Sequence, residues 1–364
     1  MTINNRRILI FLGLCLIGLF IWYFFHIVVY ILLAVVISLI GRPIIKLLNR
    51  VRIRGRKIPD TFQALLTLMS LYGIGLLIFL LFLPIVIQQA QGIASIDVQA
   101  MADKLKEPLA SVEEFAATYQ LQPEGKSIYE YAQDQLLSVI SSIQFSAIAN
   151  SITGFIGDLF LGIFAVTFIS FFFLKEKQLF FNMMMGMMPD QYEEKLKNIF
   201  VSIQNLLTRY FVGVLLEMTI VGTIVGIGLT LFGVKNALLI GFLAGTLNII
   251  PYLGPILGAI FGTIVVIATS VQMGIYGELL PLIIKVLSVF FTAQVVDNIL
   301  LQPLIYSSSV KAHPMEIFIV ILMASSVAGI PGMIFAIPAY TIFRVFAKEF
   351  FSNIKVIRSL TENL

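Results

Sequence analysis

Apolar stretches long enough to cross a membrane recur along the chain, and they constrain the fold more than any other feature. Residues 64–87, for example, contain no Asp, Glu, Lys or Arg, and about 20 apolar residues suffice for one helical crossing. Only 12% of the 364 residues are charged and 59% are hydrophobic, whereas roughly a quarter of a soluble domain is charged. The sequence therefore predicts an all-α, polytopic integral membrane protein with about eight membrane segments, and it excludes a soluble enzyme.

The first region, 1–88, holds three predicted spans, at 8–23, 27–40 and 64–87. Arg6 and Arg7 precede the first span, but no small-x-small cleavage site follows it, so we expect a retained anchor and not a signal peptide. Residues 41–60 carry seven basic residues and one acidic residue, Asp60. Because basic loops beside membrane spans stay in the cytoplasm, this loop and the N-terminus are predicted to be cytoplasmic.

The second region, 89–150, is the most polar part of the chain. It contains eight acidic and three basic residues, a net charge of −5, and an odd number of spans places it outside. Apolar residues recur at helical spacing on both sides of Pro123-Glu124-Gly125. We therefore expect an external helical hairpin whose role is packing against a neighbouring subunit.

The third region, 151–209, holds a fourth predicted span and a cytoplasmic amphipathic helix. Pro189-Asp190 suits the first turn of that helix. The methionines between 183 and 188 have no paired His or Cys nearby, so copper binding is not expected. No cofactor and no metal site are predicted anywhere in the chain.

The fourth region, 210–364, is the predicted transport core, because two of its apolar segments are interrupted. Segments 237–271 and 315–343 each contain clustered Gly and Pro residues, and paired interruptions of this kind point to a transporter binding site. Each segment could cross the membrane or re-enter it, and the sequence leaves both open. The candidate site residues at the two interruptions are Asn248, Pro251, Tyr252, Gly254, Pro255, Gly329, Pro331 and Gly332.

Polar side chains also interrupt the apolar segment between the two broken ones. An ionisable residue at membrane depth is costly unless it faces a cavity or a partner, so Asp297 is the best candidate for a titratable group and Glu217 is the second. A structural alternative, about equally weighted, pairs Asp297 with Lys285 or a backbone amide. The candidate site residues of this segment are Gln294, Asp297, Asn298, Gln302 and Pro303.

An ordered set of motifs resembles the bacterial autoinducer-2 exporter family over essentially the whole chain. The sequence departs from the family at Val214, where many relatives have Gln, and at Asp297, which is often Glu. The matching motifs are Asn248 to Pro255, Asp297 to Pro303, His313-Pro314, Gly329 to Gly332 with Ile337-Pro338, Phe173 to Glu176 with the Pro189 that follows, and Tyr210-x-x-Gly213.

The resemblance implies a multi-pass permease of the bacterial cytoplasmic membrane that assembles as a homo-oligomer, in the family a pentamer. Basic residues near the end of the chain, such as Arg344 and Arg358, agree with a cytoplasmic C-terminus. The family is associated with export of autoinducer-2, and some relatives with Na⁺(Li⁺)/H⁺ antiport. The expected partners are a small polar solute or a monovalent cation and the lipid bilayer, and not a nucleic acid.

The two activities use overlapping residues. A polyhydroxylated solute would need hydroxyl-matching groups, while an antiporter would need a titratable Asp297. An intramembrane enzyme is disfavoured because no nucleophile–base pair or metal cluster is evident, and a non-transporting membrane scaffold is the remote alternative. The groups that could bind solute hydroxyls are Asn248, Tyr252, Gln294, Asn298 and Gln302.

Overall fold

The protein is described from a computed structural model of the chain, in which 19, 23–53, 56–94, 156–176, 182, 186, 193–274, 279–309 and 312–351 are the described residues. Six of the described helices are long and apolar enough to cross a membrane, which confirms the predicted all-α polytopic class. Most of the predicted first span, the 89–150 segment and most of the methionine cluster lie outside the described residues.

The chain divides into two compact units, which are described separately. The first comprises residues 1–74 and 155–204, and the second comprises residues 75–154 and 205–364.

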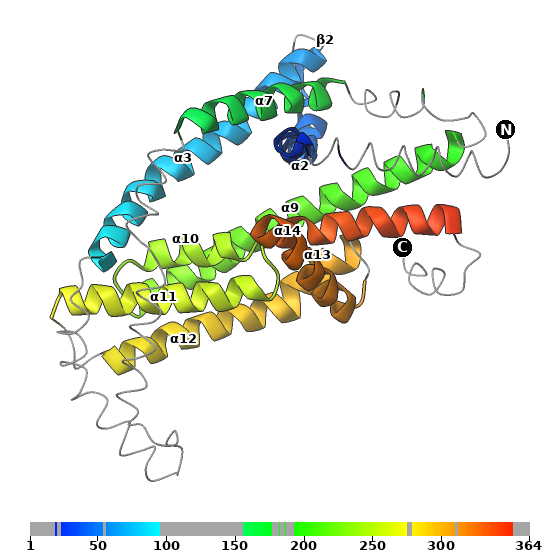
Figure 1. Cartoon of the computed structure of the whole chain (residues 1–364). Helices are drawn as coiled ribbons and strands as arrows, with labels where there is room; N and C mark the ends of the chain where they lie inside the picture. Colours follow the sequence, from blue (N-terminus) through cyan, green and yellow to red (C-terminus); the bar gives the residue numbers. More distant parts are fainter. Residues whose placement is uncertain are drawn as a thin grey trace. The chain divides into compact units, whose positions relative to one another are not determined.

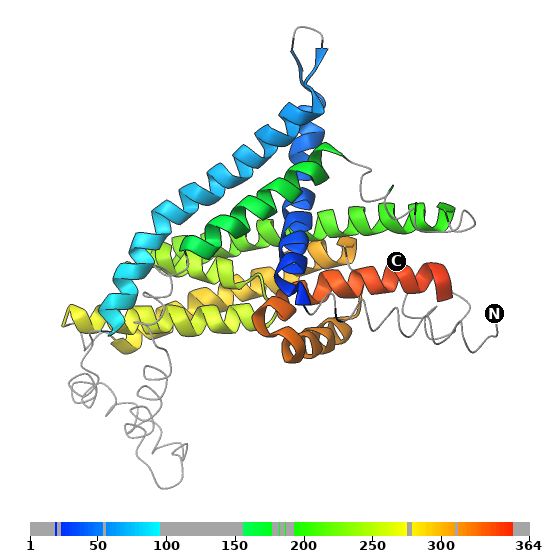
Figure 2. The same ribbon diagram turned by 45° about the horizontal axis from the view of Figure 1, so that its top comes forward.

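Three helices form the described core of the first unit: α2 (Phe25–Leu48), the first part of α3 (Asp60–Ala94), and α7 (Ile156–Lys175). Figure 2 shows α2, α3 and α7 together. Helices α2 and α7 pack along one another, and the Ser170 hydroxyl of α7 donates a hydrogen bond to the Ala34 carbonyl of α2 at 3.3 Å. A Cβ on Gly41 would lie 2.8 Å from the Thr67 side chain and 3.1 Å from that of Leu174. Gly41 therefore permits the close approach of α2 to both neighbours.

The predicted basic loop 41–60 begins inside a helix. Arg42 and Lys46 belong to the last turns of α2, and the chain then forms a short antiparallel ladder of β1 (Arg52–Ile53) and β2 (Arg56–Lys57). This ladder is the sole strand pairing among the residues that the structure describes.

The second unit begins with α9 (Glu193–Leu231), of which residues 205–231 belong to it. The predicted amphipathic helix of the third region continues without a break into the apolar start of the predicted transport core, since no Gly or Pro occurs between 193 and 212. The remaining elements are α10 (Ala237–Leu247), α11 (Leu253–Gln272), α12 (Leu279–Val296), the π-helical turn η2 (Asp297–Leu301), α13 (Gln302–Ser309) and α14 (Pro314–Phe351).

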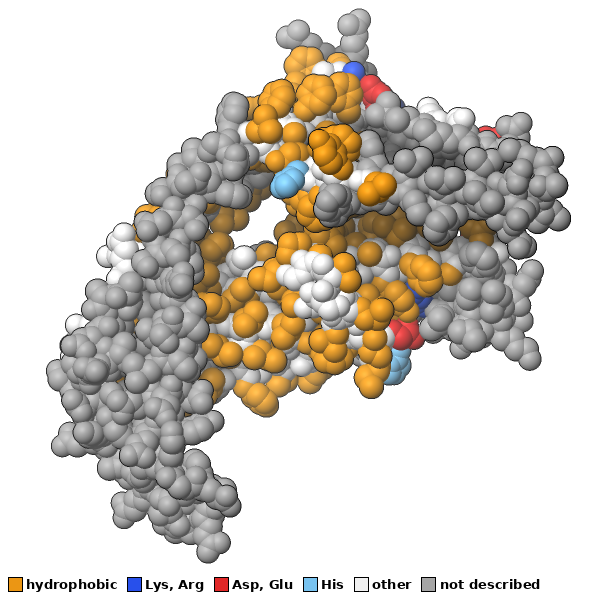
Figure 3. Space-filling view, viewed as in Figure 1, with side chains coloured by type: hydrophobic (Ala, Val, Ile, Leu, Met, Phe, Trp, Pro, Cys, Tyr) orange, Lys and Arg blue, Asp and Glu red, His pale blue; other side chains and the backbone are white. Residues whose placement is uncertain are grey.

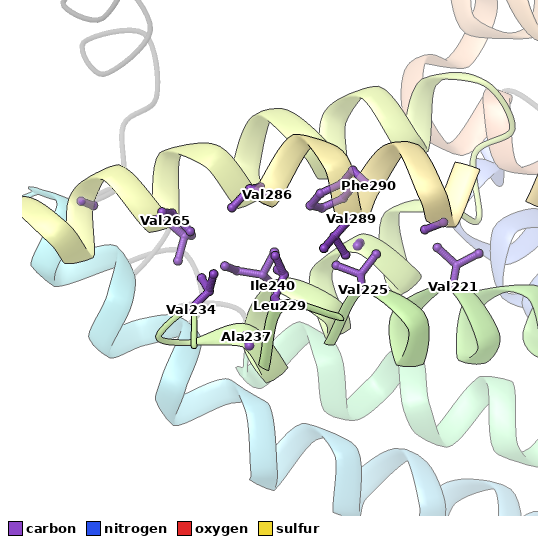
Figure 4. Close-up of a cluster of buried hydrophobic side chains, with 14 residues drawn as sticks. Val221, Val225, Leu229, Val234, Ala237, Ile240, Val265, Val286, Val289 and Phe290 are labelled. Atoms are coloured by element: carbon purple, nitrogen blue, oxygen red, sulfur yellow. The ribbon is translucent and has the colours of Figure 1, made fainter. Parts of the chain in front are cut away.

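A cluster of buried aliphatic side chains joins α9, α10, α11 and α12 (Figure 4). Leu229 and Ile240 are fully buried in it. Two glycines let the backbones of α9 and α10 meet, because a Cβ on Gly241 would lie 2.5 Å from the Gly222 carbonyl oxygen. Small residues allow this close packing between membrane helices. The labelled members of the cluster are Val221, Val225, Leu229, Val234, Ala237, Ile240, Val265, Val286, Val289 and Phe290.

The predicted break in 237–271 is confirmed, and it reverses the chain. Helices α10 and α11 lie beside each other in Figure 1. Near one end the Asn236 side chain donates a hydrogen bond to the Thr269 hydroxyl at 3.1 Å, and nearer the break a Cβ on Gly258 would lie 3.3 Å from Ala244. We call α10–α11 the first hairpin, with its tip at residues 248–252.

The predicted break in 315–343 is also confirmed. Within α14 the backbone leaves helical geometry at Ala328 and at Gly329, whose φ is 58°. The Tyr340 hydroxyl donates a 2.8 Å hydrogen bond to Glu316. These residues are 24 positions apart and would be separated by about 36 Å on a straight helix. The helix therefore folds back on itself, and we call α14 the second hairpin.

The outer surfaces of the described helices are strongly apolar. Hydrophobic side chains cover most of the described surface in the view of Figure 3. Individual residues are almost fully exposed, such as Leu231 at 82% and Val327 at 86%. Surfaces of this kind are stable against lipid tails and not against water.

Candidate functional site

Two buried carboxyl groups meet inside the second unit. Glu217 of α9 is 2% exposed and Asp297 of η2 is 1% exposed. The two groups are within hydrogen-bonding reach of each other. Glu217 Oε2 and Asp297 Oδ1 are buried and have no hydrogen-bond donor in the part of the chain that the structure describes. We call Glu217 and Asp297 the carboxyl pair.

Glycines on one face of α9 place Glu217 beside the helix that carries Asp297. A Cβ on Gly213 would lie 2.6 Å from the Ile305 side chain of α13, and one on Gly228 would lie 2.8 Å from the Val289 side chain of α12. Gly213 precedes Glu217 by four residues and thus lies on the same helix face. The Tyr210-x-x-Gly213 motif therefore includes the residue that lets α9 approach α13.

Asn248 connects the tip of the first hairpin to the carboxyl pair. It is the C-cap residue of α10 and is 4% exposed. Its Nδ2 donates a hydrogen bond to Glu217 Oε1 at 3.2 Å. The break after α10 thus places an amide donor against one member of the carboxyl pair.

A π-helical turn brings Gln302 to Asp297. The Gln302 Nε2 donates a 2.8 Å hydrogen bond to Asp297 Oδ2. In an α-helix, at about 100° per residue, side chains five positions apart point about 140° away from each other. The wider turn, in which the Gln302 backbone N–H bonds to the Asp297 carbonyl, brings these two side chains onto one face. Such π-turns are often found at functional sites.

The carboxyl pair concentrates negative charge that an added positive charge would stabilise. Two adjacent ionised carboxylates in an apolar interior carry a large desolvation and repulsion cost, and the two amide donors offset only part of it. A proton between Oε2 and Oδ1, or a monovalent cation, would remove most of that cost. No group of three or more His, Cys, Asp or Glu residues that could hold a metal ion occurs among the described residues.

Other polar candidates of this helix lie away from the carboxyl pair. Gln294 Nε2 donates to Asn298 Oδ1 at 3.0 Å, and Asn298 is exposed. Pro303 is exposed as well. Lys285 precedes Asp297 by twelve residues, about 18 Å along a helix. The hydrogen bond that Asp297 Oδ2 accepts comes instead from the side-chain amide of Gln302.

The remaining residues of the first break shape the hairpin tip. Tyr252 has a left-handed backbone with φ of 65°, and its ring packs edge-on against Phe318 of the second hairpin with centroids 5.8 Å apart. Gly254 leaves no room for a side chain, because a Cβ would collide with the Leu247 carbonyl oxygen. Pro251 is buried and Pro255 is half-buried.

The residues of the second break shape a reversal of the chain, and in the described part of the chain they make no hydrogen bond to the carboxyl pair. Gly329 and Pro331 are exposed. A Cβ on Gly332 would collide with the Ala324 carbonyl oxygen, so a glycine permits the close return of the chain.

Glu217 was predicted only as the second titratable candidate, without a place in the site. Its position 80 residues before Asp297 gives no hint of proximity. The available signal was the Gly213 four residues earlier, together with the rarity of a carboxyl group in an apolar span.

The apolar helices, the two hairpins at Gly/Pro breaks and the buried polar centre define a multi-pass membrane transporter. A sequence model described as "AI-2E family transporter" matches residues 9–352. This chain belongs to that family.

Three relatives have names that describe transport. The "Putative transport protein YueF" of Bacillus subtilis (strain 168) is 29% identical over 329 residues, covering 89% of this chain and 83% of the relative. The "Putative transport protein YrrI" of the same organism is 30% identical over 193 residues, 53% of this chain and 52% of the relative. The "Putative permease PerM" of Escherichia coli (strain K12) is 25% identical over 277 residues, 74% of each chain.

Proposed function

We propose that this transporter exchanges protons for a monovalent cation, Na⁺ or Li⁺, at the carboxyl pair. The observation that carries the proposal is the pair of buried oxygens, Glu217 Oε2 and Asp297 Oδ1, for which the described residues supply no hydrogen-bond donor. A proton shared by these atoms lowers the charge of the pair from −2 to −1. When the proton leaves, both carboxylates attract a cation, and the cation leaves when a proton returns.

The ligand set favours a monovalent cation over a divalent one. Four carboxylate oxygens are present, and two of them already accept hydrogen bonds from amides, Glu217 Oε1 from Asn248 and Asp297 Oδ2 from Gln302. Calcium takes roughly six to eight oxygen ligands and magnesium requires a near-ideal octahedron. A site with two available carboxylate oxygens is better suited to H⁺, Li⁺ or Na⁺.

Helix α10 of the first hairpin is proposed to enter the membrane without crossing it, whereas α11, which is long enough to cross, leads away from the tip. Helix α10 has 11 residues and is therefore about 16 Å long, about half of the ~30 Å hydrocarbon core. The chain reverses after it, so the tip with Asn248 would lie at membrane depth. There the opened backbone can survive only against protein or water.

The second candidate function is export of a small polyhydroxylated solute such as autoinducer-2. The family description supports it, and so does the polar tip of the first hairpin, where Asn248 and Tyr252 offer hydrogen-bonding groups to a solute. In a purely facilitative exporter Asp297 would act as a hydrogen-bond acceptor and would not need to change its charge.

Proteoliposomes with an imposed Na⁺ gradient and an internal pH dye would test the exchange. We expect Na⁺-driven proton movement in the unsubstituted protein and its loss in D297N and in E217Q. Q294L, on the same helix as Asp297 but bonded to Asn298, serves as the matched control. Exchange that persists at the native rate in both carboxyl variants would refute the proposal. Solute flux that survives D297N without any ion dependence would instead support facilitative export.

We further propose that the protein resides in the bacterial cytoplasmic membrane with both termini and residues 41–60 on the cytoplasmic side, residues 89–150 outside, and a homo-oligomeric, pentameric assembly. Single cysteines at Arg52 and Glu113, in a C15S background, would be probed with an impermeant thiol reagent. We expect labelling in intact cells at 113 and not at 52. Native mass spectrometry of the purified protein would measure the oligomer number.

A further inference from the structure

A short basic segment joins two helices of membrane-spanning length in the first unit. One span ends at Leu48 and the next begins at Asp60. The connecting residues 49–59 are therefore too few to extend far from the membrane surface. In Figure 2 the two short strands of this segment lie just beyond the adjoining ends of α2 and α3. Its position is thus fixed by the chain on either side, within reach of lipid headgroups.

The segment concentrates positive charge in an arrangement that is unfavourable without an anion. In the β1–β2 ladder Arg52 lies directly opposite Lys57, and like charges in directly opposed positions are destabilising. Arg50 is two residues away, and all three side chains are exposed. A phosphate group bound between them would offset this repulsion.

Exposed apolar side chains alternate with the basic ones. Leu47 is 64% exposed and Val51 is 44% exposed, next to Lys46 and Arg50 respectively. A surface with long cationic side chains around apolar ones suits the boundary between headgroups and acyl chains, where the apolar groups are inserted and the charges remain at the phosphates.

A single buried side chain holds the ends of this segment together. Gln63 is 1% exposed, and its Nε2 donates to Asn49 Oδ1 at 3.1 Å and to the Ile58 carbonyl at 2.7 Å. Residues 49 and 58 are thereby tied to the first turn of α3. The basic side chains are consequently presented from a closed loop and not from a free linker.

We propose that Lys46, Arg50, Arg52 and Lys57, together with Leu47 and Val51, form a binding surface for the phosphodiester headgroups of anionic lipids such as phosphatidylglycerol. We call this the basic hairpin. The proposal is independent of what the carboxyl pair transports. Basic residues beside a span also influence how a chain is oriented in the membrane. The basic hairpin would in addition enrich anionic lipid around itself, and this enrichment would depend on Arg50, Arg52 and Lys57.

Tryptophan quenching in proteoliposomes tests this. The chain has one tryptophan, Trp22, so W22F/V51W places the sole reporter on the basic hairpin. Quenching by phosphatidylglycerol with brominated tails is compared with quenching by brominated phosphatidylcholine. A preference of about fivefold for each of Arg50, Arg52 and Lys57 multiplies to a preference for the anionic lipid of roughly a hundredfold.

The variant R50Q/R52Q/K57Q in this background, which retains Lys46, should lose most of the preference, and the charge-matched control K195Q/K197Q/R209Q should keep it. High salt, with a Debye length near 3 Å at about 1 M, should weaken the preference without any substitution. The triple variant should keep the melting temperature and the size-exclusion elution volume of the unsubstituted protein, which shows that it is folded. Equal quenching by both lipids with all charges present would overturn the proposal, and so would an equal loss in the control. Binding of an RNA fragment to this segment without a lipid preference would assign the surface to another partner and overturn it as well.

Discussion

Replacement of Gln302 by leucine is the most direct test of how the carboxyl pair is tuned. The Gln302 amide donates a 2.8 Å hydrogen bond to Asp297 Oδ2, while Oδ1 has no donor in the described residues. Leucine keeps most of the side-chain volume but removes the donor. The ionised form of Asp297 then loses a stabilising contact that the protonated form needs far less.

The expected size of the effect comes from the strength of that hydrogen bond. A hydrogen bond to a charged group contributes about 1.5–3 kcal/mol. Since 1.36 kcal/mol corresponds to a tenfold change in proton affinity, the carboxyl pair should hold its proton about 10- to 100-fold more tightly. The pH of half-maximal exchange should therefore rise by about 1 to 2 pH units in Q302L, and exchange at pH values below that midpoint should fall.

The assay is Na⁺-driven proton movement in proteoliposomes, measured over a range of pH. Q294L provides the control, because it removes the same amide from the same helix at a position bonded to Asn298 and not to the carboxyl pair. Its pH midpoint should match that of the unsubstituted protein. A Q302L midpoint that also matches would show that the Gln302 amide does not act on the carboxyl pair, and the role assigned to the π-turn would fail.

Three further predictions concern the contacts that stabilise the second unit: two concern side-chain packing and one concerns a hydrogen bond. L229A removes a fully buried side chain and should lower the free energy of unfolding by about 2–5 kcal/mol, whereas L231A, at an 82% exposed position, should change it by less than about 0.5 kcal/mol; denaturation in detergent would measure both. G241L places a side chain where a Cβ already lies 2.5 Å from the facing carbonyl of α9, so it should destabilise the first hairpin by at least about 1–3 kcal/mol, and native melting temperature and folding yield would detect this. Y340F removes the 2.8 Å hydrogen bond to Glu316 and should speed hydrogen exchange across the second hairpin, by a factor equivalent to about 1–3 kcal/mol; unchanged exchange would show that this contact does not hold the two arms together.

The positions of the two helix breaks could be predicted from the sequence, because they depend on the local backbone properties of glycine and proline. Pro251, Gly254 and Pro255 mark a break because proline lacks a donor and glycine tolerates close approach, and Gly329 marks the other break for a related reason. The sequence does not say that the chain reverses at these breaks. The reversals depend on contacts between residues far apart, such as Glu316 and Tyr340.

The polar centre was only partly predictable. Asp297 stands out because a carboxyl group in an apolar span is rare. Gln294 and Asn298 look equally close to it in sequence, but closeness within one turn does not give the helix face, and they bond to each other instead. Gln302 reaches Asp297 only because the turn is π-helical, and no α-helical spacing rule pairs positions five apart.

The π-turn at Asp297–Leu301 also bears on how this span tolerates changes in length. A π-turn accommodates one more residue than the α-helical turn that it replaces, so it behaves as an insertion that the helix has absorbed. Loss of one residue from 297–301 would restore regular α-helix at that point without distorting the helix elsewhere. The same loss elsewhere in α12 would rotate every later side chain by about 100° while the π-turn remained. Relatives that have an α-helix here should therefore align with this chain across a one-residue gap at 297–301, and the residue equivalent to Gln302 should be four positions after the carboxylate.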